Sequence, residues 1–81
     1  MDINLVKNKN KNNNLKKLDT QDLVKVSDGE ESFWAIIHKK LRNCIIAKID
    51  NKLLFEKKYN YGDLFKCTEE NILDHVFVYD D

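Results

Sequence analysis

The segment SFWAIIHKKLRNCIIAKID (residues 32–50) contains two apolar runs separated by the short break LRN at 41–43. Side chains of a β-strand point alternately to the two faces of a sheet, so each run predicts a strand and the pair predicts a hairpin. One face of this hairpin carries the expected interior side chains, Phe33, Ala35, Ile37, Ile45, Ala47 and Ile49. The other face should be polar, yet it carries Trp34, Ile36 and Ile46. What covers that second face is the main functional question raised by the sequence.

Further strand patterns flank the hairpin on both sides. Short apolar runs occupy residues 22–26, 53–59, 64–67 and 75–80, and Asp28-Gly29 is a strong turn signal. Thr68 and the two glutamates after it predict a single helical turn over 68–73. This order predicts an all-β protein, a small SH3-like antiparallel β-barrel with one short helical turn and a polar N-terminal arm. An OB-like barrel fits less well, because it normally contains a longer helix.

The N-terminal part differs in composition from the rest. Residues 7–17 (KNKNKNNNLKK) are polar and low in complexity, which predicts a flexible Lys/Asn-rich arm at 1–19 before a β-barrel domain at 20–81. The formal net charge is zero, but residues 1–17 carry five lysines and one aspartate. Residues 18–81 carry nine basic and thirteen acidic residues. A basic arm therefore precedes an acidic domain.

Length and composition restrict the class of protein. A chain of 81 residues forms one small domain, and its 35% of charged residues favours a protein free in solution. It has neither an apolar run of about 20 residues nor a secretory signal, so we expect an intracellular protein without a membrane partner. Cys44 and Cys67 fit a reducing compartment as buried thiols, with a disulfide between them as the alternative.

Four short motifs carry a resemblance to a known family: GEESFW at 29–34, AKIDN at 47–51, YGDLF at 61–65 and NILD at 71–74. Together they resemble the YegJ-like domains, small bacterial domains of unknown function with relatives expected in giant DNA viruses. The resemblance covers residues 20–74 and departs at Ala47, where the pattern prefers glycine. It implies a fold more than a function. Because thirteen lysines, ten asparagines and no proline suggest an AT-rich genome, a giant-virus protein in the host cytoplasm or the virion is expected.

Residues capable of chemistry are present but poorly arranged. His38, Cys44, Cys67 and His75 are zinc-binding residue types, yet no close pair of the Cys-x₂-Cys kind occurs, so no metal site is expected. A Cys/His nucleophile pair lacks a third group, and two glycines leave no phosphate-binding loop. We therefore expect no enzyme, no cofactor and no small-molecule substrate.

Binding is the expected function. Trp34, Ile36 and Ile46, extended by Leu64, would form an exposed apolar surface, and such surfaces usually mark interaction sites. This predicts a non-catalytic module that binds a protein partner or, in the simplest case, its own copy as a homodimer. In the alternative, apolar residues of the arm (Ile3, Leu5, Val6 or Leu15) fold over this surface.

A nucleic-acid accessory protein is the second expectation. The contacts would come from basic residues of the arm and of the hairpin, namely Lys7, Lys9, Lys11, Lys16, Lys17, Lys39, Lys40 and Arg42. Lysines neutralise phosphates and Trp34 offers a stacking surface, but the basic excess lies in the arm alone.

Overall fold

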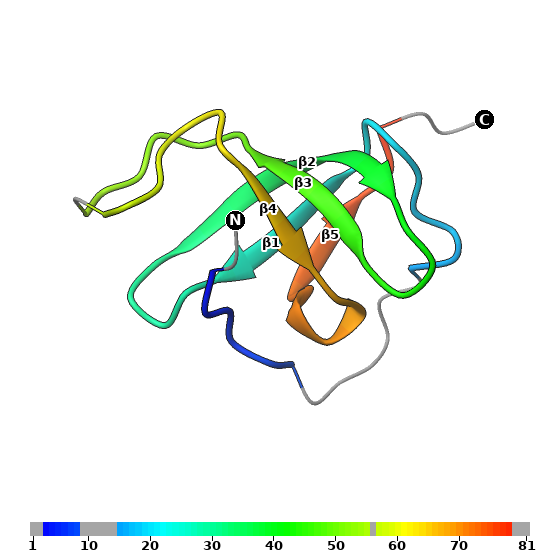
Figure 1. Cartoon of the computed structure of the whole chain (residues 1–81), viewed down its shortest axis with the longest axis horizontal. Helices are drawn as coiled ribbons and strands as arrows, with labels where there is room; N and C mark the ends of the chain where they lie inside the picture. Colours follow the sequence, from blue (N-terminus) through cyan, green and yellow to red (C-terminus); the bar gives the residue numbers. More distant parts are fainter. Residues whose placement is uncertain (1–2, 9–14, 56, 79–81) are drawn as a thin grey trace.

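The computed structural model describes residues 3–8, 15–55 and 57–78, and five strands in them form one antiparallel sheet. The strands are β1 (Leu23–Ser27), β2 (Ser32–Lys40), β3 (Ile45–Ile49), β4 (Leu64–Cys67) and β5 (Asp74–Val76), with the 3₁₀ helix η1 (Glu69–Asn71) before β5. Their order is β4-β3-β2-β1-β5. Figure 1 shows a strongly bent sheet, in which β4 crosses in front of β1. The prediction of an all-β protein is confirmed, although the described strands do not close the sheet, because its edges β4 and β5 are unpaired with each other.

Strand β2 is the centre of this sheet. Ala35 faces Val24 of β1 on one side and Ile49 of β3 on the other. The register with β3 shifts between Ile37 and Lys39, so His38 lies at a β-bulge. A bulge increases the local twist of a strand pair, which suits a sheet as bent as this one.

Two segments outside the confirmed strands have different outcomes against the sequence prediction. The expected strand at 53–59 is wrong for the described residues 53–55 and 57–59, which form a loop between β3 and β4. Backbone N–H groups of Leu54 and Phe55 donate to the Glu31 carboxylate, at 2.9 and 3.1 Å, instead of to a strand. The expected helical turn at 68–73 is present as η1, where the Asn71 amide oxygen accepts the Thr68 backbone N–H at 2.9 Å.

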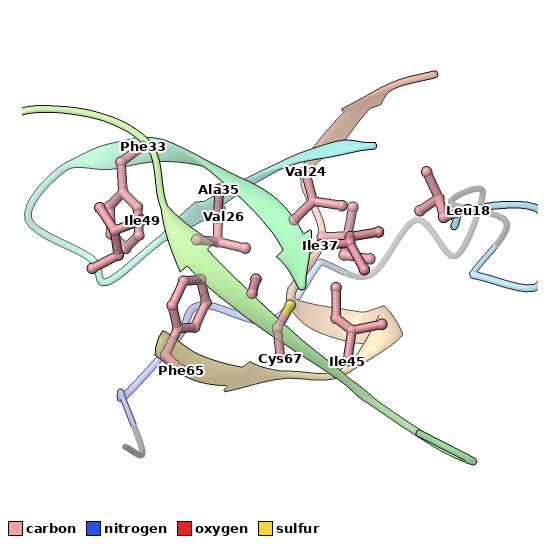
Figure 2. Packing of buried hydrophobic residues seen from close by; sticks show 12 residues of the cluster. Leu18, Val24, Val26, Phe33, Ala35, Ile37, Ile45, Ile49, Phe65 and Cys67 are labelled. Atoms are coloured by element: carbon pink, nitrogen blue, oxygen red, sulfur yellow. The ribbon is translucent and has the colours of Figure 1, made fainter. Parts of the chain in front are cut away.

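The core lies on one side of the sheet, where alternate strand residues meet. Figure 2 shows these side chains converging between the strands. The buried cluster consists of Leu18, Val24, Val26, Phe33, Ala35, Ile37, Ile45, Ala47, Ile49, Phe65, Cys67 and Ile72. The Phe33 and Phe65 rings meet edge to face with their centroids 5.9 Å apart. All six hairpin residues expected inside are buried, so the predicted phase of the alternation is confirmed.

The described parts of the N-terminal arm lie on this core side. Leu18 is fully buried, and Ile3, Leu5 and Leu15 pack against the cluster. The backbone N–H of Val6 donates to the Ser27 carbonyl at 2.8 Å, close to the end of β1. Ile3, Leu5 and Leu15 therefore do not cover Trp34, because they pack on the opposite side of the sheet. The lysine-rich tract at 9–14 lies outside the described residues.

Leu5→Ala tests the contribution of the arm to stability. Because Leu5 packs partly buried against the core, we expect its truncation to lower the free energy of unfolding by about 1–3 kcal/mol, measured by urea denaturation. Asn4→Ala, at the exposed neighbouring position, is the matched control and should leave the midpoint unchanged. Equal midpoints for both variants would show that the arm does not complete the core.

Candidate interaction surface

The face of the sheet opposite the core, here called the outer face, is built from alternate residues of all five strands. It brings together the residues singled out in the sequence: Trp34 and Ile36 on β2, Ile46 on β3 and Leu64 on β4. Strand pairing places one row of residues across the whole sheet, in the order Val76, Leu23, Ile36, Lys48 and Leu64. Four of these five side chains are apolar. The outer face therefore carries an apolar band that Lys48 interrupts between Ile36 and Leu64.

Exposure along this band is graded. Leu64 and Val76, on the two edge strands, are 41% and 45% exposed, whereas Ile36 in the middle is half-buried by its neighbours. Trp34 is also half-buried, and the Lys25 ammonium lies 6.0 Å from the centre of its ring. An ammonium group within about 6 Å of an aromatic ring makes a cation–π contact. The sheet's own side chains thus cover the apolar residues in part and leave the band accessible.

The charged residues of the strands are almost all positive. The five strands hold five lysines and a single acidic residue, Asp74. Four of those lysines belong to the outer face: Lys25, Lys39, Lys48 and Lys66. The other acidic residues within the described ranges lie in turns, loops and η1. A domain that is acidic on average therefore presents a basic face.

Sequence reasoning found the apolar centre of the outer face and missed its surroundings. Leu23, Lys25, Lys48, Lys66 and Val76 were not singled out, although the same two-residue period runs through their strands. The alternation gives the face of each residue within its own strand. Joining the five strands into one surface also requires the strand order, which no local pattern supplies.

The predicted nucleic-acid contacts do not form one surface. Lys39 lies on the outer face, while Lys16, Lys40 and Arg42 line a separate pocket. Lys17 is exposed on the arm, and Lys7 lies 3.9 Å from Glu70 in an exposed ion pair. Lys9 and Lys11 lie outside the described residues.

The Cys and His residues are likewise dispersed. His38 is exposed, His75 is half-buried, and both cysteines are buried and free. Across the described part of the chain, no three His, Cys, Asp or Glu side chains are grouped to hold a metal ion. Burial raises the pKa of the Cys67 thiol to about 12, so this thiol stays protonated and unreactive at neutral pH.

A charged cluster fixes the loop between β3 and β4. The Lys57 ammonium donates to the Asp28 carboxylate and lies 3.1 Å from Glu31 and 3.5 Å from Glu30. The Tyr59 hydroxyl also donates to Asp28, and its ring packs 6.4 Å from that of Phe33. The side chains of Lys57, Asp28 and Glu31 are only 7–8% exposed. The cluster therefore ties this loop to the β1–β2 turn.

The pKa values in this cluster follow from pairing. Burial acts to raise the pKa of Asp28, but hydrogen bonds from Lys57, Tyr59 and two backbone amides outweigh it and hold that pKa far below its usual range. The Leu54 backbone N–H is the main cause of the lowered pKa of Glu31. Burial and the hydrogen bond to Asp28 raise the pKa of Tyr59 to about 12. Each charged group has its partner here, which indicates a structural anchor.

Comparisons of the chain with protein-family models, curated proteins and solved structures find no match. Within the ranges described above, no helix is long and apolar enough to cross a membrane. The outer face and the pocket beside the arm are therefore the features from which a function can be argued.

Lys57→Met tests the anchor through its pH dependence. The pKa values of Asp28 and Glu31 are lowered by folding, so their contribution to stability is present above about pH 4 and is lost as the pH falls below it. We expect Lys57→Met to lower the melting temperature at pH 7 by about 5–10 °C. The variant should also lose less further stability than the wild type between pH 5 and pH 2. Lys58→Met, at an exposed neighbouring position, is the control, and an acid profile unchanged in Lys57→Met would contradict the anchor.

Proposed function

We propose that this protein is a non-catalytic binding module whose outer face docks a protein partner with an acidic and apolar surface. The observation that carries the proposal is the row of four apolar residues and Lys48 across five strands. Lys25, Lys39 and Lys66 lie on the same face, and Asp74 lies at its rim. Apolar side chains supply the affinity of an interface through burial. Charges around them select the partner and speed its approach.

We also propose an SH3-like barrel that is open between β4 and β5. Two features support it: four strands that follow one another as a meander, and a last strand that returns to β1 directly after a 3₁₀ turn. The relation to YegJ-like domains and the intracellular, viral setting stay predictions from the sequence.

A partner of different sequence fits the outer face better than a second copy of this chain. A two-fold axis through the face would bring the same lysines of both copies together, including Lys48 in the middle of the apolar row. Asp74, at the edge strand β5, is the one acidic residue of the strands that could compensate them. Like charges buried against each other oppose association, whereas carboxylates on a partner would pair with these lysines.

Nucleic acid is the second candidate for this face, supported by its lysines. Base stacking needs flat aromatic surfaces. The outer face offers only Trp34 for this purpose among the described strand positions, and Lys25 lies over its ring. The remaining apolar positions are aliphatic, which suits packing against protein side chains and favours a protein partner.

Selection from a library of random displayed peptides tests the proposed partner chemistry. We expect the wild-type domain to enrich peptides that combine apolar residues with Asp or Glu, because these would bury the apolar row and pair with its lysines. Ile36→Glu, in the middle of the row, should weaken binding of an enriched peptide about ten-fold or more.

Matched controls separate the outer face from general effects of charge. Leu54→Glu makes the same kind of change as Ile36→Glu at an exposed loop position. Lys48→Glu, within the row, should also weaken binding, and Lys58→Glu is its control outside the outer face. Both controls should bind like the wild type. Enrichment of basic peptides, or equal loss of binding in Leu54→Glu, would contradict the proposal. A wild-type dimer in light scattering that Ile36→Glu converts to a monomer would show that the partner is a second copy.

Binding of a single-stranded oligonucleotide distinguishes the second candidate. The charge of the arm cannot be tested by deleting the arm, because Ile3, Leu5 and Leu15 pack on the core. Replacing Lys9 and Lys11 by Gln removes two of its charges without removing these apolar residues. We expect weak binding that falls with added salt and is unaffected by Trp34→Ala, as for non-specific attraction. Tight binding that is lost in Trp34→Ala would assign nucleic acid to the outer face.

A further inference from the structure

A pocket of about 430 Å³ lies between the arm, the end of β2, the β2–β3 turn and η1. It is lined by Leu15 and Lys16 of the arm, by Lys40, Leu41, Arg42 and Asn43, and by Glu69. This volume is in the range that holds small-molecule ligands. The pocket is therefore large enough for a ligand with several functional groups.

Its position separates the pocket from the outer face. Lys40 pairs with Ile45, whose side chain is fully buried, and directly paired residues point to the same face of a sheet. Lys40 consequently projects from the core side, at the rim of the sheet. The proposed function and the pocket use different residues, so each can be tested without the other.

The charges lining the pocket are not compensated internally. Lys16, Lys40 and Arg42 contribute three positive charges and Glu69 one negative charge. No ion pair involving any of these four occurs among the described residues, and the Lys40 ammonium only donates a long hydrogen bond, of 3.4 Å, to the Lys16 carbonyl. A surplus of two positive charges thus faces an open cavity.

We propose that this pocket binds a phosphate monoester whose body carries a ring and hydroxyl groups, such as a nucleoside monophosphate. A phosphate monoester carries close to two negative charges at neutral pH, which matches the surplus. Arg42 can bind two phosphate oxygens through its planar guanidinium group, and the lysines can neutralise the remaining charge.

The other lining residues suit the body of such a ligand. Leu15 and Leu41 provide apolar surface for a ring, since Leu41 is 42% exposed and Leu15 is half-buried. The Asn43 amide and the Glu69 carboxylate can exchange hydrogen bonds with hydroxyl or amino groups. Glu69 also repels a second anionic group, which favours one phosphate over an extended polyanion.

Titration calorimetry of the full chain with three probes tests this site. We expect adenosine 5′-monophosphate to bind, and adenosine and inorganic phosphate each to bind at least about ten-fold more weakly, because each lacks half of the contacts. Glucose 6-phosphate serves as a second monoester: binding comparable to that of the nucleotide assigns the specificity to the phosphate and hydroxyl groups, whereas weaker binding assigns it to the ring.

Variants identify the pocket as the binding site. Arg42→Gln and Lys40→Gln should each weaken binding of the nucleotide about ten-fold, while Lys58→Gln and Lys48→Gln, outside the pocket, should leave it unchanged. The proposal would be overturned if millimolar nucleotide produced neither heat in calorimetry nor shifts of backbone amide signals in NMR spectra. Equal affinity for adenosine and its monophosphate would also overturn it. Loss of binding in Lys58→Gln equal to that in Arg42→Gln would overturn it as well, because it would indicate attraction by overall charge alone.

Discussion

The pairing of β2 on both of its edges is the constraint on which the remainder of the structure depends. Because β1 and β3 bind its backbone from either side, its side chains can point only to the core or to the outer face. Phe33, Ala35 and Ile37 take the core side and Trp34 and Ile36 the other. An apolar outer face is thus a direct consequence of a strand in which both alternating sets are apolar. The same pairing that buries one set of β2 side chains therefore presents the other set on the outer face.

On the core side the apolar residues must be buried, and a small bent sheet cannot enclose them by itself. Leu18 from the arm and Ile72 after η1 complete the cluster from outside the sheet. Asn71 joins the arm to the segment around η1. Its amide nitrogen donates to the Val6 carbonyl at 3.3 Å, and its amide oxygen accepts the Thr68 backbone N–H. The described parts of the arm therefore lie on the core side. This leaves the outer face without a cover from the described residues.

The parts of the fold that were predictable are those set by local patterns. The alternation in 32–50 gave the interior residues, and Gly29 and Gly62 adopt the positive φ angles, of 92° and 89°, that their turns require. The loop at 53–59 was not predictable in this way, because Glu31 and Lys57 fix it through contacts between distant segments. Trp34, Ile36, Ile46 and Leu64 of the candidate surface were found because each lies in a strand with clear alternation. The pocket beside the arm was missed because its residues come from three separated segments.

The positive charge of the outer face follows from the chemistry of the turns. Carboxylates accept backbone N–H groups, and several turns use them in this way: Asp28 binds the amides of Glu30 and Glu31 at 2.9 and 3.0 Å, and Asp63 binds that of Asn60 at 2.8 Å. Lysine cannot accept a hydrogen bond, so it has no such role in a turn and occupies outward strand positions instead. Charge is screened over about 8 Å at physiological ionic strength, so a partner approaching the sheet is attracted by the lysines beside it more than it is repelled by distant turns. A protein with no net charge can in this way select an acidic partner on one face.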